Sequence, residues 1–236
     1  MNVRLQATSC LRIPRVEIAA VAILVALAAA LVPPSLAAAE KQWYKGHTHC
    51  HSLWSDGDQL PELVLDWYKS RGYDFACLSD HNVLMEGIRW YPLNHAKRPV
   101  TRDMLDQCRE HFGDGWLEVR GEGDGREVRL KTYEEIRKTL EVPGEFLMIQ
   151  AEEITGKCEQ KEVHVNAINL VEVIRPQPGR TVIETIQADL AAVRRQAEVT
   201  GRPILAHVNH PNWRRYDITA SDLAEAIDVR FFELCN

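Results

Sequence analysis

Short apolar runs alternate with amphipathic stretches along most of this chain of 236 residues. The apolar runs are rich in β-branched and aromatic residues and are bounded by turn residues, so they predict strands. The predicted strands cover residues 73–78, 146–151, 163–171, 203–208 and 229–234, and the more polar residues 43–51 are predicted as a strand that leads into a loop. Because helical signals lie between most of the successive runs, the pattern is typical of an α/β fold with parallel strands.

Helix-start signals mark the stretches between the strands. The predicted helices begin at Pro61, Thr132, Thr181 and Thr219. Proline is favoured at the first helical position, because it has no N–H that would be left unpaired there. Thr132 and Thr181 are each followed three residues later by Glu, which is the pattern of a capping box.

The stretch from about residue 95 to residue 130 fits this alternation poorly. It is polar and carries several glycine turn signals. We interpret it as an inserted helix and hairpin on the site side of the domain, with the character of a lid. His95 and His111 lie among charged residues and end no apolar strand, so we expect both at the surface rather than in a site.

The first 39 residues have the pattern of a secretory signal peptide. Arg4, Arg12 and Arg15 precede an apolar run over 18–32, and small residues at 37–39 form a cleavage site. The run is shorter than the ~20 residues of a spanning helix, and a retained N-terminal anchor is the alternative. We therefore expect an exported protein, periplasmic or extracellular, with no stable membrane span after processing.

Composition adds limits on size and partners. The chain is 45% hydrophobic and 26% charged, which is ordinary for a globular protein, and it is long enough for one barrel-sized domain. The formal net charge is -6, and no block of Lys and Arg stands out. A nucleic-acid-binding surface is therefore not evident.

Metal-binding residue types recur beside the apolar runs. His47, His49 and His51 alternate along one run, and alternate side chains of a strand point to the same side. The later positions of this kind are His81, Glu152, Glu153, His164, His207 and His210. Parallel strands of an α/β barrel end at one edge, where the chemistry collects. Imidazole and carboxylate in this pattern predict a site for zinc, manganese or iron.

Two neighbouring pairs leave alternatives open. Glu152 and Glu153 are adjacent, and adjacent strand residues face opposite ways, so both enter one site only if the strand has ended. His207 and His210 are alternative site residues for a similar reason, because the side of the sheet that each one faces depends on where their strand ends.

Taken in order, the motifs resemble those of the PHP (polymerase and histidinol phosphatase) superfamily of metal-dependent phosphoesterases. The matching residues are His49, His51, Ser52, Ser55, Asp56, Gly57, Asp80, His81, Asn82, Glu153, Thr155, His164, His210 and Pro211. The resemblance covers nearly all of residues 43–236 and implies a distorted (β/α)7 TIM-like barrel with two or three metals. The ligand set that it implies is His49, His51, Asp56, His81, Glu153, His164 and His210.

Three departures from the family pattern affect this expectation. His47 stands where many relatives carry Asp or Asn, so a hydrogen bond to a ligand is as good an interpretation as ligation. Glu152 and His207 compete with Glu153 and His210, which fit the family spacing. The family's final D-x-H pair has no match before Asn236. We therefore expect a fragment or degenerate copy, incomplete at the C-terminus with the last strand or strands missing, and with little turnover.

The implied chemistry is hydrolysis. Two or three divalent transition metals, Zn, Mn or Fe, would activate a bridging hydroxide that attacks a small phosphorylated or ester substrate. Asp56 and His81 are candidates for a third metal or for protonation of the leaving group. The sequence has no G-x-S-x-G elbow and no phosphate-binding P-loop. The alternatives are hydrolysis of a carboxylic ester, amide or carbamate at the same site, and a non-catalytic metal-binding domain with an incomplete ligand set.

Overall fold

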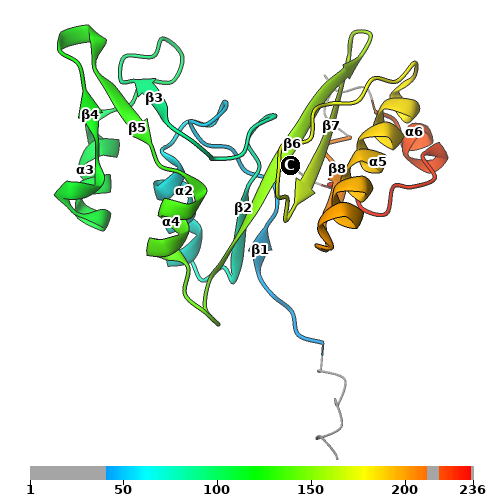
Figure 1. The fold of residues 1–236 in the computed structure, drawn as a ribbon, viewed down its shortest axis with the longest axis horizontal. Helices are drawn as coiled ribbons and strands as arrows, with labels where there is room; N and C mark the ends of the chain where they lie inside the picture. The colour runs from blue at the N-terminus through cyan, green and yellow to red at the C-terminus, as the bar shows by residue number, and fades with distance from the viewer. Residues whose placement is uncertain (1–40, 212–217, 235–236) are drawn as a thin grey trace, which may run out of the picture. The chain divides into compact units, whose positions relative to one another are not determined.

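Residues 41–211 and 218–234 are described in the computed structural model of the protein. The chain divides into residues 1–43 and residues 44–236, and the elements named in this section all belong to the second unit. The described residues of that unit have a mixed α/β fold (Figure 1). The predicted signal peptide lies outside the described residues. Within the described ranges, none of the helices has the length and apolar character needed to span a membrane.

A curled sheet of five strands, shaped like half a barrel, forms the centre of this unit (Figure 1). In spatial order the strands are β1 (Gly46–His47), β2 (Phe75–Leu78), β6 (Leu147–Cys158), β7 (Lys161–Ile168) and β8 (Leu205–Val208). Strands β1, β2 and β6 pair in parallel, whereas β7 runs antiparallel to both β6 and β8. The carboxyl ends of β1, β2 and β8 and the amino end of β7 therefore lie at the same edge of the sheet.

The prediction of parallel strands is wrong for β7. Cys158 at the end of β6 pairs with Lys161 at the start of β7, so only two residues join the strands. A connection of that length can join antiparallel strands only, because a parallel crossover needs a dozen residues or more. Glu159 takes the positive φ of 56° that the turn requires, a role usually given to Gly or Asn. The sequence therefore carried no ordinary turn signal here.

Two predicted strands are shorter than expected. The strand predicted over residues 43–51 is limited to β1, and the one predicted over 229–234 is reduced to a single parallel bridge between Phe232 and Val208. After β1 one backbone hydrogen bond, from the N–H of Ser79 to the Cys50 carbonyl at 2.8 Å, continues the pairing, and the other bonds involve side chains. The N–H of Cys50 donates to Ser79 Oγ at 3.2 Å, and Asn166 Nδ2 donates to the Thr48 carbonyl at 2.7 Å.

The helices cover the outer face of the curled sheet. They are α2 (Pro61–Ser70), α4 (Tyr133–Leu140), α5 (Val182–Thr200) and α6 (Ala220–Glu225). Helices α2 and α4 pack together beside β2, and α5 packs against β6, β7 and β8 (Figure 1). The predicted starts are confirmed, with Thr132 forming a complete capping box. Thr181 caps α5, but the Glu184 carboxylate accepts from the N–H of Arg180 instead of closing the box.

A second, smaller sheet precedes β6 in the chain. Its antiparallel strands, in the order β3-β5-β4, are β3 (Arg89–Pro92), β5 (Glu127–Leu130) and β4 (Val119–Arg120). Helix α3 (Arg102–Phe112) and the 3-10 turns η1 (Asp114–Trp116) and η2 (Gly123–Gly125) complete this region. The buried carboxylate of Glu62 on α2 accepts from the Trp116 indole at 2.9 Å, which fixes the region to α2.

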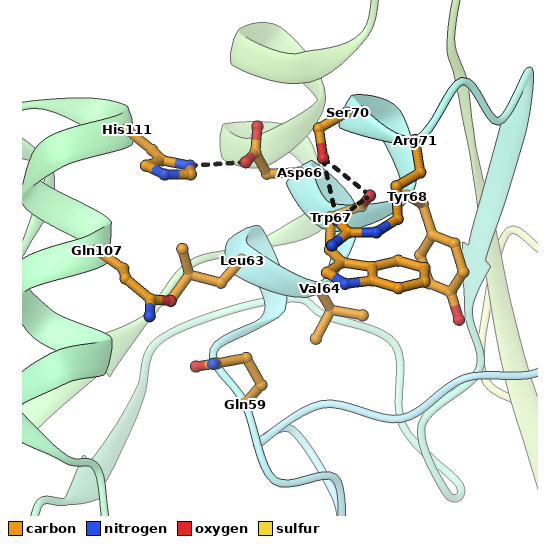
Figure 2. Close-up of a pocket in the computed structure, with 10 residues that line it drawn as sticks. All are labelled: Gln59, Leu63, Val64, Asp66, Trp67, Tyr68, Ser70, Arg71, Gln107 and His111. Carbon is orange, nitrogen blue, oxygen red and sulfur yellow. Dashed lines mark hydrogen bonds and ion pairs between the residues drawn. The ribbon is translucent and has the colours of Figure 1, made fainter.

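Helices α2 and α3 line a surface pocket of about 370 Å³ (Figure 2). His111 and Asp66 form an ion pair across it at 2.7 Å, and the Arg71 guanidinium lies over the Trp67 ring at 4.1 Å. His111 is therefore a surface residue, as predicted. His95 is half-buried instead, and its Nδ1 accepts from the N–H of Arg98.

Candidate metal centre

Five histidines form a ring on the inner face of the sheet, the face not covered by helices. In order around the ring they are His49, His51, His81, His164 and His210, and neighbouring ring centroids lie 4.5–5.5 Å apart. They come from the segments after β1 and β2, from the first half of β7, and from the segment after β8. Because β7 is reversed, its amino-terminal half reaches the edge at which the parallel strands end.

The Glu153 carboxylate lies at the centre of this ring. Its Oε2 atom is 3.1 Å from His51 Nε2, 3.1 Å from His81 Nδ1 and 3.4 Å from His49 Nε2. Its Oε1 atom is 2.9 Å from His164 Nδ1 and 3.2 Å from His210 Nε2. The two oxygens therefore face two separate groups of imidazoles.

The charges in the ring depend on one another. Burial alone would raise the pKa of Glu153, but contacts with His164, His210, His49 and His51 hold that pKa well below its usual range. Burial alone would lower the pKa of His49, but its contacts with Glu153 and Glu233 raise that pKa to about 9. The Glu153 carboxylate is thus anionic across the physiological range, which is the state that binds a cation.

Strand alternation separates Glu152 from Glu153. Glu153 pairs with Asn166 on the inner face, while the Glu152 side chain points to the outer face. There, Glu152 Oε1 accepts from the N–H of Ile174 at 2.6 Å, and burial raises the pKa of Glu152 to about 7. Glu152, an alternative in the sequence-based ligand set, is therefore not brought to the histidine ring.

The segment that carries Asp56 folds around a second carboxylate. The buried Asp80 accepts from Ser52 N at 2.9 Å, from Ser52 Oγ at 2.8 Å and from Ser55 Oγ at 2.6 Å. This places Asp56 Oδ1 3.2 Å from His81 Nε2 and 3.5 Å from His51 Nδ1. Gly57 is required here, because a Cβ at this position would lie 2.4 Å from the His51 carbonyl.

His47 and His207 lie outside the ring. The His47 ring packs on Tyr68 with centroids 4.7 Å apart, so it points toward α2. The His207 ring lies 6.5 Å from that of His49, and neither of its nitrogens hydrogen-bonds to any described residue. Burial lowers the pKa of both imidazoles, so both are neutral. His207 shares the inner face with Asn166, its pairing partner on β7.

Glu233 joins the site although the sequence reasoning missed it. Its carboxylate lies 3.0 Å from His49 Nδ1 and accepts from the N–H of His210 at 2.8 Å. A carboxylate on the far nitrogen of a ligating histidine fixes the ring's orientation and raises its basicity. A signal was present, since Glu233 interrupts the apolar run Phe231-Phe232-Glu233-Leu234, much as Glu152 and Glu153 follow the run over 146–151.

Asparagines complete the support of Glu153. Asn209 Nδ2 donates to Glu153 Oε1 at 2.6 Å and to Asn166 Oδ1 at 2.7 Å. Asn166 Nδ2 in turn donates to the carbonyl of Thr48 at 2.7 Å, and Thr48 directly precedes His49 in the chain. The two amides therefore link the Glu153 carboxylate to the segment that carries the first histidines of the ring.

This donor set fits divalent metal ions. Three overlapping groups each bring their ligand atoms within 4.8 Å of one another: His49 with His51 and Glu153, His51 with Asp56 and His81, and His81 with Glu153 and His164. Glu153 Oε2 is buried and makes no well-formed hydrogen bond to any described residue, although three imidazole nitrogens approach it. Mixed nitrogen and carboxylate ligands are those that zinc, manganese and iron prefer.

Comparisons with known proteins add little to this geometry. No family model matches the chain, and no curated protein matches it. Among solved structures, the chain is similar to a "putative metal-dependent phosphoesterase" from Bifidobacterium adolescentis, with 14% sequence identity, 82% of this chain and 78% of that chain covered, and a TM-score of 0.37. A likeness at this level does not establish a function, so the functional conclusion depends on the site itself.

Proposed function

We propose that this protein is a metal-dependent phosphoesterase of the PHP type. The observation that carries the proposal is the Glu153 carboxylate, whose two oxygens face two groups of imidazoles. A bridging carboxylate of this kind is suited to hold two divalent ions, Zn, Mn or Fe, side by side. His49 and His51 would hold one ion with Oε2, and His164 and His210 would hold the other with Oε1.

Bound ions supply Lewis acidity, which activates water for attack on a phosphoryl group and neutralises charge on the phosphate oxygens. The contribution of the chain is to fix the ligands. Glu233 contacts His49 at Nδ1 and leaves Nε2 facing Glu153, and the Asn209 amide holds the Glu153 carboxylate in place by donating to Oε1.

Asp56 and His81 have the position of a proton donor pair. His81 Nε2 lies 3.2 Å from Asp56 Oδ1, and the two side chains are 26% and 51% exposed. Burial lowers the pKa of His81, which makes its imidazolium a stronger proton donor. We propose that this pair protonates the leaving group, with ligation of a third ion together with His51 as the competing role.

The curled sheet supports a finer assignment of the fold. Strands β1, β2, β6 and β8 run in the same direction, and the candidate ligands lie at their shared edge. This is the relation between strands and site in α/β barrels. We propose that the sheet is the part of a distorted (β/α)7 barrel that carries the metal centre.

Metal content and turnover test the function together. We expect protein purified without chelator to contain two or more equivalents of transition metal by elemental analysis, and to hydrolyse an aryl phosphate faster than the matching aryl ester. Changing His49 and His51 together to Ala should remove most of the metal, because two of the three imidazoles around Glu153 Oε2 are lost.

His111→Ala is the matched control, because His111 is an imidazole paired with Asp66 on α2 and lies outside the ring. The proposal is wrong if metal-free protein cannot be reloaded with metal. Turnover of the aryl ester alone, by metal-loaded protein, would point to carboxylic ester hydrolysis at the same site.

A further inference from the structure

Arg98 lies beside Asp56, whose side chain, 51% exposed, is the most exposed of the candidate ligands. Its Nη2 is 3.6 Å from Asp56 Oδ2, and its Nε is 3.4 Å from Asp58 Oδ1. Within residues 41–211 and 218–234, it is the one Lys or Arg that forms an ion pair with Asp56 or Glu153. The Asp56 carboxylate therefore meets His81 through one oxygen and Arg98 through the other.

The backbone of Arg98 is held firmly. Its N–H donates to His95 Nδ1 at 3.2 Å, and its carbonyl accepts from the Tyr91 hydroxyl at 3.0 Å. The two supporting rings pack together with centroids 5.2 Å apart. The N–H of Val100 donates to the Leu93 carbonyl at 2.9 Å and closes the loop between β3 and α3. Such a loop presents its side chain in a fixed place, which lowers the entropy lost on binding.

The guanidinium itself is weakly engaged. Both of its ion-pair distances exceed 3.3 Å, and Arg98 Nε is buried without a hydrogen bond to any described residue. One of its partners, Asp58, has a side chain that is 92% exposed, so that pair is screened by solvent. A guanidinium has five N–H donors in a planar fork, and these contacts satisfy few of them.

We propose that Arg98 binds the anionic group of the substrate, and so makes the site selective for phosphate esters over neutral esters. The proposal rests on the proposed function and deepens it. A guanidinium fork can donate to two oxygens of one phosphate, which is the geometry that Arg provides and Lys does not. Divalent ions held by the histidine ring would offset the negative charge on Asp56, and Arg98 would add a further cation beside its exposed carboxylate.

Phosphate binding tests this without turnover. Inorganic phosphate is titrated calorimetrically into metal-loaded full-length protein, as wild type, Arg98→Gln, Arg98→Lys and Arg102→Gln. We expect Arg98→Gln to weaken phosphate binding about tenfold or more, with metal content unchanged, because a charge-assisted hydrogen bond is lost. Arg98→Lys should recover only part of the affinity. Arg102→Gln, which removes the same charge from a 91% exposed position on α3, should bind as wild type does.

Two results would overturn the proposal: phosphate affinity of Arg98→Gln equal to that of wild type, or loss of metal from Arg98→Gln in step with loss of phosphate. The second would show that Arg98 only clamps the Asp56 segment. Steady-state assays keep the two proposals apart. If the protein hydrolyses aryl phosphate and Arg98→Gln leaves its KM unchanged, the role of Arg98 is refuted but the proposed function stands. If phosphate binding depends on Arg98 but the protein does not hydrolyse aryl phosphate, the proposed function is refuted but the role of Arg98 in binding stands.

Discussion

Glu152 and Glu153 provide a matched pair of substitutions. Both side chains are fully buried, both sit in β6, and they face opposite sides of the sheet. Glu153→Gln removes the charge that five histidines surround. Removing a residue that only hydrogen-bonds to a metal ligand already weakens metal binding about 10–100-fold. We therefore expect Glu153→Gln to weaken metal binding by more than about 100-fold, which is about 3 kcal/mol.

Glu152→Gln should leave the metal in place and change the pH dependence of stability instead. Burial raises the pKa of Glu152 to about 7, from an ordinary value of 4.5. Between these values the folded protein keeps a proton that the unfolded chain has lost, so the free energy of unfolding falls as pH rises. At 1.36 kcal/mol per pKa unit, the wild type loses up to about 3 kcal/mol by pH 8. Gln does not ionise, so the variant should gain stability relative to wild type on going from pH 5 to pH 8.

Elemental analysis after dialysis measures the loss of metal. Urea unfolding of metal-free protein at pH 5 and pH 8 measures the change in stability. The reasoning about the faces of β6 is refuted if Glu152→Gln loses metal as Glu153→Gln does, or if Glu153→Gln keeps its full metal content. It also fails if the stability of Glu152→Gln follows that of wild type at both pH values.

Three further outcomes follow from the same contacts. Glu233→Gln should weaken metal binding about 10–100-fold in competition with a chelator, because His49 loses its orienting partner, and unchanged affinity would contradict this. Metal binding at pH 7 should release about one proton, because the pKa of His49 is about 9 in the metal-free protein. Calorimetry in buffers of different ionisation enthalpy would detect the released proton, and binding without proton release would refute this prediction. Gly57→Ala should lower both Tm and metal content, since its Cβ would meet the His51 carbonyl at 2.4 Å, and a variant with wild-type Tm would exclude this.

Local signals in the sequence were enough to locate the starts of α2, α4, α5 and α6, whereas α3 was expected only somewhere within residues 95–130. Pro61, Thr132 and Thr219 act within one turn of the chain, and each stands at the start of an observed helix. Although the choice of Glu153 and His210 came from the family spacing, strand ends also predicted that His49, His51, His81 and His164 would converge. Such a signal survives errors in strand length, because it depends only on which edge of the sheet a residue reaches.

Long-range pairing was harder to predict. The direction of β7 depends on a turn at Glu159 that lacks Gly and Asn, so the sequence favoured a parallel strand. The choice between Glu152 and Glu153 depends on register, which a one-residue slip reverses. Glu233 reaches His49 only through the bridge between Phe232 and Val208, and nothing local to residue 233 marks that bridge.

The contact between His49 and Glu233 has a consequence for how the protein assembles. It joins positions 184 residues apart, and closing a flexible loop of that length costs on the order of 5 kcal/mol of chain entropy. We expect that contact to form late, after the strands between the two positions have paired. Two ions that share the Glu153 carboxylate, one held by His49 and the other by His210, would act as a cross-link between the first and last segments of the sheet. Chelation should therefore loosen both edges before it disturbs β6 and β7, and hydrogen exchange would begin at residues 46–51 and 205–210.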